Sequence, residues 1–194
     1  MLNEPRKSPA PYIAAAVVIV LLLAVLCLSF LRTLYTFAVV VSGSSMEDTV
    51  RDGDVVYALR SFTAERGDII IIDVSGSDDF SAGTENIIKR LIAKEGDTVK
   101  CENGVVYVRP AGGEYTALDE PYTKGVTPDF GEVTVREGEI FFLGDHRNVS
   151  HDSTEVGTLR YSDIIGVVPD WAISIKGFTT GWENFRAALQ NMFS

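Results

Sequence analysis

The stretch YIAAAVVIVLLLAVLCLSFL, residues 12–31, constrains this chain most, because it contains 20 consecutive residues without a charge. A helix needs ~20 apolar residues to cross a bilayer core about 30 Å thick. A cleavable secretory signal is the alternative, but its apolar region is usually about 7–15 residues long and ends in small residues. This stretch ends in Phe30 and Leu31, followed by Arg32. We therefore predict a transmembrane helix over residues 12–31.

The charges beside this helix bear on its orientation. Arg6 and Lys7 precede it, and only Arg32 follows closely. Basic residues favour the cytoplasmic side, so this asymmetry weakly favours a cytoplasmic N-terminus. We expect a cytoplasmic tail over residues 1–11 and an extracytoplasmic domain over residues 32–194.

The charge of the chain argues against a nucleic-acid partner. The formal charge is −10; three basic residues and one acidic residue lie at or before Arg32, which leaves 14 basic and 26 acidic residues beyond it. A surface with that field repels phosphate backbones, and no cluster of Lys and Arg interrupts it. Attraction to a membrane through charge is equally disfavoured.

The cysteines predict neither a disulfide nor a metal site. Cys27 falls in the predicted membrane helix and Cys101 lies well outside it, so no intrachain disulfide is expected. No set of Cys and His residues has the spacing of metal ligands. We expect neither a metal nor an organic cofactor.

One pattern recurs beyond the helix: a glycine beside charged residues, followed by a β-branched run. Glycine suits the turn, and runs of Val, Ile and aromatic residues favour strands. We predict a mainly β domain of about eight strands. They fall within Thr33–Val41, Arg51–Val56, Arg66–Val74, Glu85–Ala93, Glu95–Val99, Gly104–Arg109, Glu137–Phe142 and Ile164–Val168.

Three segments differ from this pattern. Ser75–Thr84 and Ala111–Gly131 lack periodicity and are rich in turn-forming residues, so they are predicted loops. Near the end, apolar residues recur at helical spacing and predict a short amphipathic helix, which more often packs on its own domain than on a membrane or partner. These residues are Trp182, Phe185, Leu189 and Met192, with Phe193 beside them.

The first candidate for chemistry is the serine-rich turn after the first predicted strand, Val41–Thr49, which contains Ser45. By itself such a turn is commonly only a turn. Its small residues would, however, let backbone N–H groups point at one spot, as an oxyanion hole requires.

A serine nucleophile needs a base, and the chain offers His146, His151 or a lysine. A lysine base must be desolvated to lose its proton near neutral pH. Lys89 sits on a predicted strand whose alternation puts Ile87 and Leu91 on its own face. It either extends its amine to water or is buried with a lowered pKa.

The third candidate is the polar run that leaves the strand ending at Phe142. Asp145 and Arg147 could pair there, and Ser150 or Asp152 could orient another polar group. A solvated loop with local hydrogen bonds is the alternative. Residues 148–150 also fit the low-specificity glycosylation pattern.

Together these clusters resemble the type I signal peptidase family in order and spacing. Each of four boxes is weak alone, but their order is specific, and the resemblance covers the anchor and essentially the whole outer domain. The similar segments are Gly43–Met46 with Thr49, Arg66–Asp68 with Ile69–Ile72, Lys89–Arg90 with Glu95–Asp97, and Gly144–Asp145 through Asp152–Ser153.

The resemblance implies roles for individual residues. Ser45 matches the nucleophile, whose backbone N–H contributes to the oxyanion hole, and Lys89 matches the general base. Ser150 matches the hydroxyl that orients the lysine amine. Asp145, Arg147 and Asp152 match supporting positions.

The chain departs from the family pattern at several positions. Gly43 stands where some members carry a side-chain hydroxyl for the oxyanion hole, Asp48 replaces a proline, and His146 replaces an asparagine. Thr154 replaces an arginine, which leaves the neutralisation of Asp152 in question. The chain's length is similar to the compact members, which are mostly from Gram-positive bacteria.

The resemblance implies a plasma-membrane serine endopeptidase with one spanning helix. It would remove signal peptides from secreted preproteins, whose extended segment carries small residues one and three positions before the cut. An inactive, membrane-tethered peptide-binding β domain and a self-cleaving Ser/Lys protease are the alternatives. Oligomeric state is not predicted.

Overall fold

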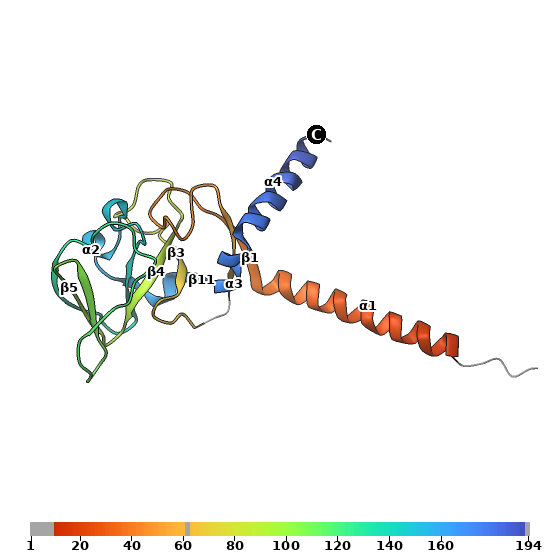
Figure 1. Ribbon diagram of the computed structural model, residues 1–194, viewed down its shortest axis with the longest axis horizontal. Coiled ribbons are helices and arrows are strands. Elements are labelled where there is room, and N and C mark those ends of the chain that lie inside the picture. The colour runs from red at the N-terminus through yellow and green to blue at the C-terminus, as the bar shows by residue number, and fades with distance from the viewer. Residues whose placement is uncertain (1–9, 61–62, 193–194) are drawn as a thin grey trace, which may run out of the picture. The chain divides into compact units, whose positions relative to one another are not determined.

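The computed structural model describes residues 10–60 and 63–192. Its backbone forms two units, one ending at Thr36 and the other beginning at Phe37. The described part of the first unit is one helix and the residue after it, and the second unit contains the rest of the strands and the remaining helices (Figure 1). The second unit contains every predicted site residue.

Helix α1 spans Ala10–Tyr35. Its segment Tyr12–Phe30 has a mean hydropathy of 3.1 and is long and apolar enough to cross a membrane. The helix is longer than the predicted 12–31, and it extends into the stretch where a strand was predicted to begin at Thr33. No Gly or Pro occurs between Tyr12 and Tyr35, so nothing in the local chemistry ends the helix earlier.

The domain is mainly β and antiparallel, which confirms the predicted fold class. Seven strands form one sheet in the order β1-β2-β11-β3-β4-β9-β10, and four form a second in the order β7-β6-β5-β8. The strands are β1 Thr36–Val40, β2 Val55–Leu59, β3 Ile69–Asp73, β4 Asn86–Lys94, β5 Thr98–Glu102, β6 Val105–Arg109, β7 Thr116–Ala117, β8 Phe130–Thr134, β9 Glu139–Leu143, β10 Leu159–Arg160 and β11 Ile164–Val168.

The eight predicted strands all exist, but three were missed. β7 and β10 are two-residue strands at sheet edges, too short to show alternation. β8 contains two exposed polar positions and begins inside the segment 111–131 that was predicted to be a loop. The prediction of a continuous loop there was wrong, because edge strands with one solvated side carry a weak apolar signal.

Strand β4 lies between β3 and β9 and contributes to all three apolar clusters of the core. Ile88, Leu91 and Ile92 each belong to a different cluster. The pairing of β4 with β9 shifts register between Leu91 and Ala93, which is a β-bulge. A polar residue in the middle of β4 is therefore desolvated from several sides.

Two of the glycine turns are joined by an ion pair. Arg66 donates to both carboxylate oxygens of Asp97 at 2.6 Å, and Asp97 is 1% exposed. The ion pair joins the segments Arg66–Asp68 and Glu95–Asp97, and so holds the turn before β3 against the turn after β4. Their role in this structure is architectural.

The remaining helices are α2 Ser153–Val156, α3 Asp170–Ser174 and α4 Lys176–Met192, with 3-10 turns η1 Arg147–Val149 and η2 Tyr161–Asp163. The predicted C-terminal helix exists. The expectation that its apolar stripe packs on the domain was wrong for Trp182 and Phe185, which are 53% and 55% exposed. Leu189, Met192 and Phe193 lie outside the described side chains.

The two cysteines are free. Cys101 is buried in the cluster beneath the second sheet, and Cys27 is exposed on α1. Cys101 therefore packs as a small apolar residue.

Candidate active site

Ser45 lies in a turn whose backbone is held by contacts of the neighbouring residues. The chain leaves β1 and turns at Gly43, whose φ of +87° favours glycine. The Gly43 N–H donates to Asp52 at 2.8 Å. Met46 is fully buried, and burying such a side chain contributes roughly 1.5–3 kcal/mol. Ser45 itself is half-buried, so the turn presents its hydroxyl while the next residue fixes the backbone.

The Lys89 amine is buried and forms a hydrogen bond with an uncharged side chain. The side chain is 4% exposed, so it does not extend to water. Its Nζ donates to the Ser150 hydroxyl at 3.0 Å. Burial lowers the pKa of Lys89 from 10.5 to about 8, and the carboxylates of Asp152, Asp145 and Glu155 limit that fall. The neutral amine is therefore the minor form at neutral pH, far more populated than in an ordinary lysine, and becomes the major form above about pH 8.

Ser45 and Lys89 line the same two adjoining cavities, of about 240 and 630 Å³. The smaller is walled by β1 and the loop after it on one side and by β4 on the other, with Val39–Ser42 and Asn86–Ile88. The larger is walled by the loop Asp79–Ser81 and by Val149 and His151. The Ser45 and Lys89 side chains are not hydrogen-bonded to each other, and contacts between a catalytic nucleophile and its base often tighten only when substrate binds.

Neither histidine is placed to serve Ser45. The ring of His151 contacts Glu155 through Nδ1 at 2.5 Å and the Asp79 carbonyl through Nε2 at 2.8 Å. The ring of His146 lies 3.3 Å from the Ser44 carbonyl through Nδ1. Its backbone N–H donates to the Ser45 carbonyl at 2.9 Å. The lysine is thus the base that the geometry offers.

The predicted pairing of Asp145 with Arg147 is wrong. Asp145 is fully buried and accepts two hydrogen bonds from Arg90, at 2.6 and 2.8 Å, and one from the Thr49 hydroxyl at 2.5 Å. The Arg90 guanidinium also lies 3.7 Å from the centre of the Tyr122 ring. Asp145 therefore links the turn that carries Ser45 to β4.

Arg147 instead binds the segment 120–127. Its guanidinium contacts the carboxylate of Glu120 and the hydroxyl of Thr127, and Nε donates to the Gly144 carbonyl at 3.0 Å. The sequence placed Arg90 in a family-like segment without giving it a role, and it did not indicate Glu120 or Tyr122. Arg90 stands beside Lys89 on a strand and so had a signal, whereas Glu120 and Tyr122 lie in an aperiodic segment that had none.

Asp152 is buried without an arginine partner. One oxygen accepts from the Gly144 N–H at 3.0 Å; the other accepts from the Thr154 N–H at 3.2 Å and its hydroxyl at 2.9 Å. Asp152 also caps α2. Hydrogen bonds of this kind to a carboxylate are about twice as strong as neutral ones. Thr154, which replaces the family's arginine, thus contributes directly to holding Asp152.

Gly144 occupies the point where three segments converge. A Cβ at this position would lie 2.2 Å from the Ser150 hydroxyl oxygen and 2.5 Å from the Ser45 carbonyl oxygen. Neither contact is sterically possible. The absence of a side chain here lets the turn that carries Ser45 approach the loop that carries Ser150.

The predicted oxyanion-hole donor is the Ser45 N–H, which meets no acceptor among the described residues. Gly43 adds no side-chain hydroxyl to it. This role stays a prediction.

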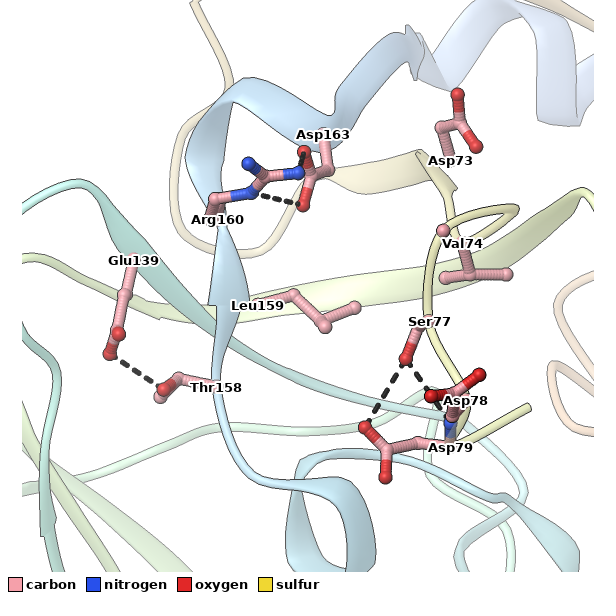
Figure 2. A pocket seen from close by; sticks show the side chains of 11 residues that line it. Asp73, Val74, Ser77, Asp78, Asp79, Glu139, Thr158, Leu159, Arg160 and Asp163 are labelled. Atoms are coloured by element: carbon pink, nitrogen blue, oxygen red, sulfur yellow. Dashed lines mark hydrogen bonds and ion pairs between the residues drawn. The ribbon is translucent and has the colours of Figure 1, made fainter.

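A separate cavity of about 490 Å³ lies behind the loop 75–84 and is acidic (Figure 2). Figure 2 shows Arg160 turned toward Asp163, Thr158 toward Glu139 and Ser77 toward Asp79. The described residues that line it include neither lysine nor histidine. Over residues 10–60 and 63–192, no group of three or more His, Cys, Asp or Glu side chains is placed to hold a metal ion.

A serine and a buried lysine that line one cavity, with a second serine bound to the lysine amine, are the arrangement that a Ser/Lys hydrolase would need. The family described as signal peptidase, peptidase S26, matches residues 13–171. Signal peptidase I of Bacillus licheniformis is 36% identical over 71% of this chain and 74% of its own length. Signal peptidase I of Bacillus amyloliquefaciens is 34% identical over 78% of this chain and 79% of its own length.

A crystal structure of a signal peptidase I from Enterococcus faecalis V583 is 27% identical, with a TM-score of 0.45, and covers 56% of this chain and 98% of that one. The family match and the two Bacillus relatives decide the assignment. The chain belongs to the signal peptidase family, peptidase S26, and is a serine peptidase.

Proposed function

We propose that this protein removes signal peptides from secretory preproteins, with Ser45 as nucleophile and Lys89 as general base. The observation that carries the assignment of roles is the buried Lys89 amine, hydrogen-bonded to Ser150 at 3.0 Å in a cavity that Ser45 also lines. Membership in the family supports the reaction and the substrate class. Neither alternative, the inactive binding domain or the self-cleaving protease, has support from the relatives.

The reaction proceeds in two stages, acylation of Ser45 and hydrolysis of the acyl-enzyme. Neutral Lys89 takes the proton of the Ser45 hydroxyl as Oγ attacks the scissile carbonyl, and the Ser45 N–H donates to the oxyanion that forms. The lysine then gives its proton to the departing amine, which leaves an acyl-enzyme. Water loses a proton to Lys89 and releases the signal peptide as a carboxylic acid, while Ser45 regains its hydrogen. General-base assistance of this kind supplies about 10²–10⁴-fold in rate.

Ser150 acts as a positioning residue. Its hydroxyl accepts from Lys89 Nζ and so fixes the lone pair of the neutral amine in one direction. Asp145, Arg147 and Asp152 hold the surrounding loops: Asp145 through Arg90 and Thr49, Arg147 through Glu120 and Thr127, and Asp152 through Gly144 and Thr154.

The substrate binds in extended form between β1 and β4. Both strands supply wall residues to the cavity of about 240 Å³ beside Ser45, which suits small side chains. An extended segment there would gain main-chain hydrogen bonds by strand addition, while shallow pockets select side chains. Small residues one and three positions before the cut fit this volume.

The anchor sets the location. We propose a cytoplasmic tail over residues 1–11, one membrane span over 12–31 and an extracytoplasmic catalytic domain over 32–194, in the plasma membrane. The apolar α1 supports a span, and Arg6 and Lys7 support the orientation. Ser45 lies only 10 residues after Tyr35, the last residue of α1. The preprotein is therefore cleaved at the outer surface of the membrane.

The test is preprotein cleavage in detergent or vesicles by wild type, Ser45→Ala and Lys89→Met. Both variants should fold and lose nearly all activity. Ser75→Ala and Lys94→Met are matched controls, since Ser75 bonds Asp73 in an exposed turn and Lys94 pairs with Glu65 at the end of β4. Cleavage that survives either dyad substitution would refute the dyad. An inactive wild type on several preproteins would favour the peptide-binding alternative.

A further inference from the structure

Helix α4 presents apolar side chains to the outside. Phe178, Trp182 and Phe185 are 75%, 53% and 55% exposed. They follow one another by four and three residues, which places them on one face of the helix. The rings of Trp182 and Phe185 lie 6.1 Å apart, centre to centre. We call these three residues the aromatic stripe.

The opposite, polar side of α4 attaches the helix to the domain. The Thr180 hydroxyl accepts from the Val55 N–H at 2.8 Å, and the Thr179 hydroxyl, in a residue 4% exposed, donates to the Val55 carbonyl. A helix on a soluble domain does the reverse and turns its apolar face inward. The aromatic stripe therefore needs an apolar environment that the domain does not provide.

Connectivity indicates what that environment is. β1 begins at the residue after α1 ends, so its five residues extend at most about 17 Å from the helix end. β1 neighbours β2 in the sheet, and α4 binds Val55, the first residue of β2. Helix α4 is thus attached to β2, which is the neighbour of β1, the strand that follows the anchor helix.

The composition of α4 fits a lipid interface rather than a second copy of this chain. Trp and Phe on one face and polar residues on the others characterise helices that lie in the headgroup region. A second copy would bring another acidic domain of the same charge, and the net charge of −10 opposes that approach.

We propose that α4 lies in the membrane interface through the aromatic stripe and gives the catalytic domain a second contact with the bilayer. This inference rests on the anchoring by α1 proposed above. The contact is apolar, because α4 carries only Lys176, Arg186 and Glu183 as charged residues. Its strength should therefore change little with salt or with the fraction of anionic lipid.

The chain's two tryptophans, Trp171 and Trp182, make the test direct. Full-length Trp171→Phe, which retains Trp182 alone, is reconstituted into phosphatidylcholine vesicles with or without brominated acyl chains. We expect brominated lipid to quench Trp182 emission at least about twofold, with a blue-shifted spectrum. Adding Phe178→Ser and Phe185→Ser should reduce the quenching, whereas adding Asn184→Ser, on a polar side of the same helix, should not.

The outcomes separate this proposal from the anchoring. Vesicle flotation of the same sample reports whether α1 holds the chain in the bilayer. Flotation without quenching would overturn the interfacial contact alone. A blue shift without quenching would show that protein, such as a second copy, covers the stripe, and would also overturn it. Failure to float would overturn the anchoring and this proposal together.

Discussion

The two faces of β4 hold two adjacent buried cations in opposite environments. Arg90 is bound by both oxygens of Asp145 and lies against the Tyr122 ring. Lys89 donates only to the Ser150 hydroxyl among the described residues. Successive residues of a strand point to opposite faces, so one residue of separation suffices for this difference. A cation paired with a carboxylate is fixed in its charge, whereas a buried cation beside a neutral hydroxyl can release its proton.

The largest expected effect follows from giving Lys89 the character of its neighbour. Lys89→Arg keeps a buried cation but cannot deprotonate, so kcat/KM for preprotein cleavage should fall about 10²–10⁴-fold. In wild type, kcat/KM should rise with pH and reach half its plateau near the Lys89 pKa of about 8. A pH-rate profile measures both. A wild-type profile flat between about pH 6 and pH 9 would contradict the role of the neutral amine.

Replacing each cation by methionine should change stability in opposite directions. Arg90→Met leaves Asp145 buried without its partner and should lower the free energy of unfolding by about 3–5 kcal/mol. Lys89→Met removes a cation whose folded pKa is lowered from 10.5 to about 8, so at neutral pH it should raise stability by up to about 3 kcal/mol. Denaturant unfolding in detergent measures both values.

The pH dependence of the lysine effect has a definite sign. Between the folded pKa near 8 and the unfolded value of 10.5, the native state binds fewer protons, so wild-type stability rises with pH. The stability gain of Lys89→Met should therefore shrink across this window. Destabilisation by Lys89→Met at neutral pH would mean that the amine is not penalised by burial.

A smaller effect is expected at Ser150. Ser150→Ala removes the acceptor for Lys89 Nζ, and a hydrogen bond to a charged group contributes about 1.5–3 kcal/mol. A loss of that size in transition-state stabilisation lowers kcat/KM roughly 10–150-fold. Because the role is one of positioning, kcat should fall more than KM changes. A pure rise in KM would indicate that Ser150 contacts the substrate instead.

The smallest effect concerns His151. Its hydrogen bond to the Asp79 carbonyl and its contact with Glu155 raise its pKa above 6.5. Through these two contacts the charged ring holds the loop 75–84 against α2. This stabilisation is present below the unfolded pKa and is lost as pH rises through the folded pKa. The ring is exposed, so His151→Ala should cost about 0.2–1 kcal/mol at about pH 5 and less at about pH 9. Thermal unfolding at both pH values tests this.

Much of the fold and of the site could be predicted, for different physical reasons. Glycine turns and β-branched runs are local signals, and they located eight of the strands. Lys89 and Ser150 are 61 residues apart, and only the ordered boxes indicated that they would meet. The partner of Asp145 was not predictable from proximity, because Arg147 is nearer in sequence but points to the segment 120–127.

Helix α4 illustrates a different limit. Its sequence shows an apolar and a polar side, but amphipathicity alone does not say which side faces the domain. Two threonine hydroxyls that bind Val55 decide it, and a threonine has no distinctive helical signal.

Gly144 has a consequence for how the family's last motif should be understood. Its Gly-Asp pair meets two different requirements. The Asp145 carboxylate binds Arg90 and Thr49, and the missing side chain of Gly144 leaves room for Ser150 and the Ser45 carbonyl. The Cβ of alanine alone would lie within 2.5 Å of the Ser45 carbonyl oxygen and closer still to Ser150. The vacant space at residue 144 can therefore be neither filled nor moved without separating the three segments that form it.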